Sequence, residues 1–143
     1  MNAVDVLNVN ESFMVINADT WLGSGFKQIS LSAPNTIAAV EMDDCSRYGS
    51  LVVNEEKVER FLEKEISYGS GLINAGLYHL SPGIFDEISK GTRFSLEADV
   101  FPALVDGGML SAIEINTDFI DIGVPEDYLR FCRWIESGKE IEL

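Results

Sequence analysis

Histidine and cysteine are scarce in this sequence, which restricts the kinds of site that it can form. His79 is the only histidine, and the two cysteines, Cys45 and Cys132, are far apart in the chain. This set has no zinc-ligand spacing, and one histidine in this place does not support a Ser-His-Asp triad. We therefore interpret His79 as a packing residue at a strand end and both cysteines as reduced thiols in a reducing compartment.

Basic residues are also few. The 143-residue chain has 10 lysines and arginines against 24 aspartates and glutamates, which gives a formal net charge of -14. Binding to a nucleic-acid backbone needs clustered lysine and arginine, so the composition excludes nucleic acid as a partner. Small phosphorylated substrates are not excluded, because a divalent metal ion can bring a phosphate to an acidic site.

Long apolar runs are absent as well. The longest are far shorter than a membrane span, and residues 1–5 show neither the basic nor the apolar region of a signal peptide. Hydrophobic residues nevertheless make up 46% of the chain, which is typical of a globular protein. We therefore expect one cytoplasmic domain over residues 1–143 that does not contact a membrane.

Short apolar segments alternate with helix-like segments along the chain. The segments predicted to be strands are 13–17, 36–42, 50–53, 58–63, 72–80, 110–115 and 119–122. The segments predicted to be helices are 4–7, 26–31, 83–88, 96–105 and the one that begins at Pro125. Several strands, including 13–17, are apolar on both faces, which predicts an α/β fold with a Rossmann-like, mostly parallel sheet and helices on both faces.

Two carboxylates stand at the ends of apolar strands. Asp19 follows the segment 13–17, and Asp121 is the one charged residue in the segment 119–123. In open α/β sheets, ligands bind beyond the carboxyl ends of the strands, and two acids brought together there would need a hard cation such as Mg²⁺. The alternative is structural: Asp19 caps a turn and Asp121 caps the last helix.

The segment 72–80 carries a polar notch. Alternation places Asn74 and Gly76 on one side of this strand, together with Leu72 and Tyr78, and the missing bulk beside Asn74 suits a hydroxylated ligand. The alternative is a buried asparagine that is satisfied by backbone groups. Lys64, in an acidic run before a glycine-rich connection, is a candidate phosphate contact or simply part of a solvated surface.

Six segments occur in the order seen in the sugar-1-phosphate nucleotidyltransferases, and the likeness covers nearly the whole chain. They are INADTW (16–21), SRYGSLVV (46–53), FLEKE (61–65), SGLINAGLYHLSP (70–82), FSLEADVFPALV (94–105) and FIDIGVPEDY (119–128). The sequence most resembles the guanylyltransferases that act on mannose 1-phosphate and heptose 1-phosphate. The resemblance implies a transferase of nucleotide-sugar biosynthesis, of the kind that supplies lipopolysaccharide or capsule precursors.

The resemblance also implies a reaction and its metal. A sugar 1-phosphate attacks the α-phosphorus of a nucleoside triphosphate, which gives an NDP-sugar and pyrophosphate. Asp19 and Asp121 would hold the Mg²⁺ that gathers both phosphates, and Lys64 would contact the sugar phosphate. The remaining substrate contacts implied by the resemblance are Glu63 to a sugar hydroxyl, and Asn74 with the backbone of Gly49 and Gly76 to the sugar ring. Glu97 would either orient the site or cap its helix.

Departures from the family pattern accompany this resemblance. Ala18 stands where glycine is usual, Glu65 where proline is usual, and Val124 where a threonine usually caps the helix. The family's opening third, with its glycine-rich nucleotide loop and first strands, has no counterpart in these 143 residues. We expect the strand at 13–17 to be left with an open edge, which favours self-association or binding of a partner segment. The alternative to an enzyme is a non-catalytic remnant or regulatory binding module with the same fold.

Overall fold

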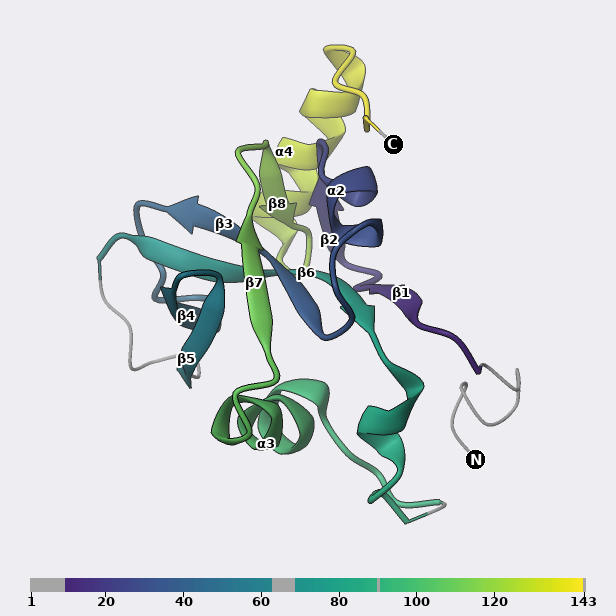
Figure 1. The fold of residues 1–143 in the computed structure, drawn as a ribbon. Helices are drawn as coiled ribbons and strands as arrows, with labels where there is room; N and C mark the ends of the chain where they lie inside the picture. Colours follow the sequence, from purple (N-terminus) through teal and green to yellow (C-terminus); the bar gives the residue numbers. More distant parts are fainter. Residues whose placement is uncertain (1–9, 63–68, 90, 143) are drawn as a thin grey trace.

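A computed structural model describes residues 10–62, 69–89 and 91–142 (Figure 1). The described part contains eight strands and several short helices. In chain order the elements are β1 (Phe13–Ile16), β2 (Thr20–Leu22), α2 (Phe26–Ser30), β3 (Thr36–Met42), β4 (Ser50–Asn54), β5 (Lys57–Leu62), β6 (Gly71–Leu80), a 3₁₀ turn (Pro82–Phe85), a π-helical turn (Leu96–Val100), α3 (Phe101–Asp106), β7 (Ser111–Glu114), β8 (Phe119–Asp121) and α4 (Pro125–Glu136).

Six of these strands form one sheet in the order β1-β6-β3-β7-β5-β4. Because β4 also pairs with β6, the strands from β6 round to β4 close on themselves like a barrel. The other two strands, β2 and β8, form a separate two-stranded ribbon. The predicted strands are therefore present, and the chain is α/β as expected.

The prediction of a mostly parallel sheet is wrong for the described strands. Only β3 and β7 run parallel, and every other described pairing is antiparallel. Strands that are apolar on both faces indicate a sheet covered on both sides, and this burial does not depend on strand direction. The tight turn between β4 and β5 instead makes those two strands antiparallel.

Helices cover both faces of the sheet, as the sequence predicts. One core includes Ala38 and Val40 of β3 and Ile29 of α2, and the other includes Ile37 and Phe101, which begins α3. Alternate residues of β3 thus enter opposite cores, as the two-residue period of a strand requires. In Figure 1, α3 lies below the sheet and α2 above it.

The long strand β6 changes neighbours along one of its edges. Its first part pairs with β4 at Leu72 and Ile73, and its last part pairs with β1 from Leu77 to Leu80. Between these parts, the register with β3 shifts, and Gly76 adopts a left-handed backbone with φ 72°. Such a bulge bends the strand and leaves polar groups beside a gap between neighbours.

Strand β1 is only half-buried, which corrects the expectation that it is covered on both faces. Met14 and Ile16 are 37% and 47% exposed, because their side of the strand faces an open groove beside α2. Among the described strands β1 pairs only with β6, so no described strand occupies its other edge. No helix in the described ranges has both the length and the apolar character of a membrane span.

Candidate functional site

The ribbon of β2 and β8 brings Asp19 and Asp121 to the same point. Thr20 lies opposite Asp121 in this ribbon, and the Ile122 amide donates to the Asp19 carbonyl at 2.8 Å. A β-carbon built on Gly123 would lie 2.9 Å from Asp121 Oδ1 and 4.0 Å from Asp19 Oδ2. Both carboxylates therefore lie beside Gly123, which has no side chain to separate them.

Asp121 also shapes the turn that leads into α4. Its Oδ1 accepts the Gly123 amide at 2.8 Å, whereas Val124, at the N-cap position of the helix, provides no side-chain cap. Asp121 therefore closes a turn ahead of α4 and does not cap the helix, whose N-cap residue is Val124. A carboxylate has two oxygens with several acceptor positions, so this hydrogen bond is compatible with a further ligand.

A second polar cluster is centred on Asn74. Its Nδ2 donates to Glu97 Oε1 at 2.8 Å and to the Tyr78 hydroxyl at 2.9 Å, and its Oδ1 accepts the Gly76 amide at 3.1 Å. The backbone amide of Asn74 donates to the Gly49 carbonyl at 2.9 Å. The structure therefore brings together four residues that the resemblance implicates in sugar binding, namely Gly49, Asn74, Gly76 and Glu97.

Other residues cap the helix that contains Glu97. Ser95 caps this helix, because its hydroxyl accepts the Ala98 amide at 3.2 Å. Asp99 completes the cap by accepting the Ser95 amide at 2.7 Å. Glu97 is free of that task and instead orients the Asn74 amide.

Tyr78 lies between the two clusters. It is 1% exposed, and burial raises its pKa to about 12, while hydrogen bonds from Asn74 and Asn17 oppose the shift. The negative charges of Glu97 and Asp19 raise the same pKa further, so Tyr78 is within electrostatic reach of both clusters. The phenol stays protonated at neutral pH and provides a neutral hydrogen-bonding group at this place.

The raised pKa of Tyr78 predicts a specific loss of stability in alkali. The pKa of Tyr78 is near 10 in the unfolded chain and about 12 in the folded protein. The stability that the buried neutral phenol contributes is therefore complete below pH 10 and is lost as the pH rises to 12. We expect the free energy of unfolding to fall about 2–3 kcal/mol more in the parent protein than in Tyr78→Phe between about pH 9 and pH 13. Urea unfolding measures this difference. Tyr128→Phe is the control, because Tyr128 is 53% exposed, and an equal loss in parent and Tyr78→Phe would contradict the prediction.

Sequence reasoning missed Asn17 and Thr20. A β-carbon on Gly76 would lie 2.9 Å from Asn17 Nδ2 and 3.0 Å from Thr20 Oγ1, so both side chains border the bulge of β6. The backbone amide of Asn17 also donates a hydrogen bond to the Gly76 carbonyl at 2.8 Å. The sequence does place both residues close to Asp19. Only the structure shows that their side chains contact the bulge of β6.

Other candidates have simpler outcomes. Glu63 and Lys64 lie outside the described residues, so their suggested roles stay predictions. His79 is 8% exposed, with Nδ1 3.0 Å from the Ser32 carbonyl, which confirms it as a packing residue. Cys45 is buried and Cys132 half-buried, and both are free thiols.

The sequence matches a known family over nearly its whole length. A family model described as Nucleotidyl transferase matches residues 1–138, so the chain belongs to that family. It is 33% identical to mannose-1-phosphate guanyltransferase of Schizosaccharomyces pombe, over 94% of this chain and 40% of that protein. It is 32% identical to mannose-1-phosphate guanyltransferase beta-A of Xenopus laevis, over 92% of this chain and 38% of that protein.

A solved structure supports the same assignment. The fold is similar to that of HddC from Yersinia pseudotuberculosis complexed with GMP-PN, with a TM-score of 0.76 and 36% identity. That match covers 94% of this chain and 59% of the solved one. The chain thus spans about two fifths of the curated relatives and about three fifths of this structure.

Proposed function

We propose that this chain is the sugar-phosphate- and Mg²⁺-binding part of a nucleotidyltransferase that makes an NDP-sugar and pyrophosphate. The observation that carries the proposal is the placement of the Asp19 and Asp121 carboxylates around Gly123. The names of the relatives favour GTP with mannose 1-phosphate or a related heptose phosphate as substrates. Nucleotide-sugar synthesis from these substrates would be cytoplasmic.

The residues around Gly123 fit a magnesium ion. Mg²⁺ binds one or two protein carboxylates and keeps its other positions for water and substrate phosphates. Within the described part of the chain, no group of three or more histidine, cysteine, aspartate or glutamate side chains is placed to hold a metal. Two carboxylates beside an open space therefore match what this ion requires, and a bound ion would supply charge neutralisation for the two phosphates.

The second cluster would fix the sugar. Glu97 and Tyr78 hold the Asn74 side chain in one orientation, so its carbonyl oxygen meets a sugar hydroxyl without first reorganising. By resemblance, Lys64 would neutralise the charge of the sugar phosphate, and Glu63 would accept a hydrogen bond from a sugar hydroxyl. The phosphate oxygen of the sugar then attacks the α-phosphorus in line, the bond to the β-phosphate oxygen breaks, and pyrophosphate leaves. No covalent intermediate with the protein is required.

Pyrophosphate release tests this function. Purified chain is incubated with GTP, mannose 1-phosphate and Mg²⁺, and release that depends on all three supports a catalytic chain. A second candidate is a non-catalytic binding module with the same fold. That candidate predicts no release but retained binding of mannose 1-phosphate, which calorimetry measures. Absence of both release and binding would contradict the proposed function.

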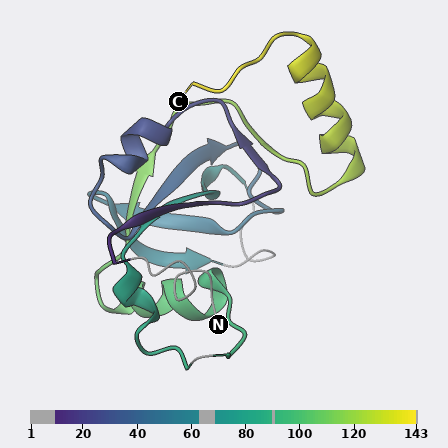
Figure 2. The ribbon, with the colours of Figure 1, turned by 90° about the vertical axis from the view of Figure 1, so that its right-hand side faces the viewer.

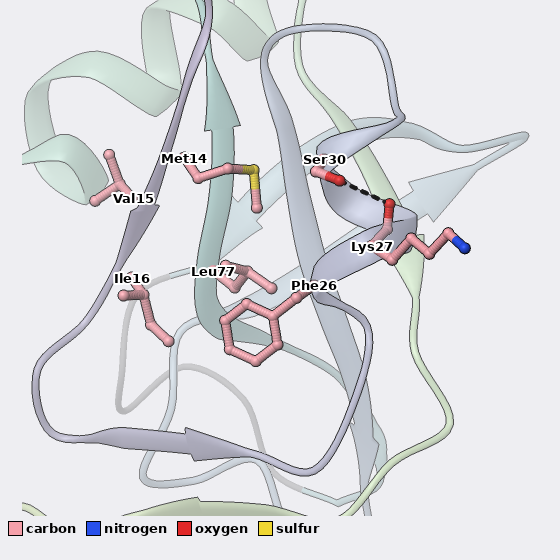
Figure 3. Close-up of a pocket in the computed structure, with 7 residues that line it drawn as sticks. All are labelled: Met14, Val15, Ile16, Phe26, Lys27, Ser30 and Leu77. Carbon is pink, nitrogen blue, oxygen red and sulfur yellow. Dashed lines mark hydrogen bonds between the residues drawn. The ribbon is translucent and has the colours of Figure 1, made fainter. Parts of the chain in front are cut away.

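We also propose that the open edge of β1 binds a further strand, from a second copy or from a partner segment. A groove of about 400 Å³ lies between β1 and α2, lined by Met14, Val15, Ile16, Phe26, Lys27, Ser30 and Leu77. The Met14, Phe26 and Leu77 side chains gather in this groove, while the Lys27 ammonium points away from them (Figure 3). An apolar groove beside unpaired backbone groups favours strand addition.

Light scattering tests whether two copies associate through the edge of β1. We expect the parent chain to associate as its concentration rises, and Ile16→Lys to stay monomeric because a lysine on the edge opposes strand pairing. Leu31→Lys is the matched control, since Leu31 is 76% exposed and does not line the groove. A parent chain that is monomeric at high concentration would count against self-association, and equal association in all three proteins would count against the β1 edge as its site.

A further inference from the structure

Asp127 is a buried carboxylate that lies away from both clusters. Its side chain is 7% exposed, in the first turn of α4, and its Oδ2 accepts a hydrogen bond from Arg47 Nη2 at 2.7 Å. Arg130, one turn further along the same helix, approaches Asp127 Oδ1 at 3.2 Å. A buried carboxylate is costly unless it is paired, so these contacts hold the start of α4 firmly.

Arg47 differs from Arg130 because it comes from another part of the chain. It lies in the connection between β3 and β4, eighty residues before Asp127 in sequence. The Asp127 carboxylate raises the pKa of the Arg47 guanidinium, and Asp121 adds to the same effect. Arg47 is therefore charged and within electrostatic reach of Asp121.

The residues that follow Arg47 contact both halves of the proposed site. The Tyr48 ring meets Phe119 of β8 edge to face, with centroids 5.6 Å apart. The carbonyl of Gly49 accepts the Asn74 amide at 2.9 Å. The segment 47–49 thus contacts the first turn of α4, strand β8 and the sugar cluster within three residues.

The start of α4 needs such support from outside. Val124 gives no side-chain cap, and Figure 2 shows α4 standing at one side of the body. Asp121 is oriented by its hydrogen bond from the Gly123 amide, so its direction depends on where residues 122–124 lie. That connection is held at one end by β8 and at the other by Asp127.

We infer that Arg47 is a positioning residue for the metal site: by holding Asp127, it fixes the β8–α4 connection and so orients the Asp121 carboxylate towards Asp19. This inference rests on the proposed function in assigning a metal to these carboxylates. The orientation itself is a property of the metal-free chain. It can therefore be tested with and without an ion.

Hydrogen exchange of the Gly123 amide tests the orientation without metal. In Arg47→Met we expect exchange at Gly123 to be about tenfold faster than in the parent, because the hydrogen bond to Asp121 opens more often. Arg130→Met is the matched control, since it removes a partner of the same carboxylate from within α4 and leaves the link to Arg47 intact. Unchanged exchange in Arg47→Met, or equal acceleration in both variants, would overturn the inference whatever the metal does.

Mn²⁺ binding, followed by electron paramagnetic resonance of the free ion, tests the consequence. Loss of a group that supports a metal ligand typically weakens binding by about 10–100-fold, so we expect at least a tenfold rise in Kd for Arg47→Met and little change for Arg130→Met. Arg47→Lys, which keeps the charge, should restore part of the affinity. Equal affinity in Arg47→Met and the parent would overturn the positioning role of Arg47 and leave the proposed metal site standing.

Two further outcomes keep the test decisive. A parent chain that binds no Mn²⁺ would overturn the proposed metal site and the positioning role with it, even if Gly123 exchange responds as expected. Where circular dichroism shows that Arg47→Met is not folded, Arg47→Gln takes its place. This variant keeps a donor but no charge, and the same direction of change in exchange and in Kd is expected.

Discussion

Asp121→Asn is expected to weaken divalent-cation binding by more than about tenfold and to lower any pyrophosphate release by about a hundredfold or more. The amide keeps an oxygen but loses the charge that attracts the ion, and Asp19 is then left as the only carboxylate beside Gly123. Asp19→Asn should have an effect of similar size, because both carboxylates face the same space. Mn²⁺ titration of each variant measures the loss, and the release assay measures its consequence.

Asp118→Asn is the matched control for this prediction. Asp118 lies three residues before Asp121, in the turn between β7 and β8, and pairs with Lys139 instead of facing Gly123. The same loss of charge there should leave cation binding within about twofold of the parent, because the Asp118 carboxylate is exposed, paired with Lys139 and screened by solvent. Equal losses for Asp118→Asn and Asp121→Asn would mean that the cation responds to overall charge, and the proposed site would be wrong.

Gly76→Ala is expected to lower the free energy of unfolding by about 2–4 kcal/mol. The backbone at Gly76 is left-handed, with φ 72°, which strains any residue that has a β-carbon. The new methyl group would also lie 2.9 Å from Asn17 Nδ2 and 3.0 Å from Thr20 Oγ1, so these side chains must move. Because both border the site, binding of mannose 1-phosphate should weaken as well. Urea unfolding and calorimetry measure the two effects.

Gly108→Ala separates the two causes of this loss. Gly108 is also left-handed, with φ 63°, but a β-carbon there would meet nothing within 4 Å. It should cost only the conformational part, about 1 kcal/mol, and leave ligand binding unchanged. A cost for Gly76→Ala no larger than that for Gly108→Ala would show that Asn17 and Thr20 yield without strain.

Local patterns predicted most elements of the fold. Strand β3 was predicted with its observed bounds, and the predicted start of the helix at residue 96 agrees with the observed cap at Ser95, because strand periodicity and capping depend on residues close in sequence. The direction of the strands was not predicted correctly, because burial on both faces is the same for parallel and antiparallel neighbours. The exposed face of β1 was also unforeseen, since an apolar strand carries no signal of whether another segment covers it.

The sequence by itself determined the family, the acidic and apolar character of the chain, and the residues from which a site could be built. Only the tertiary structure decided how these residues meet. Asn74 of β6 meets Glu97 of the π-helical turn across 23 residues, and Arg47 meets Asp127 across eighty residues. Hydrogen bonds and ion pairs between distant residues depend on chain direction and on bulges such as the one at Gly76, and neither leaves a periodic trace in the sequence.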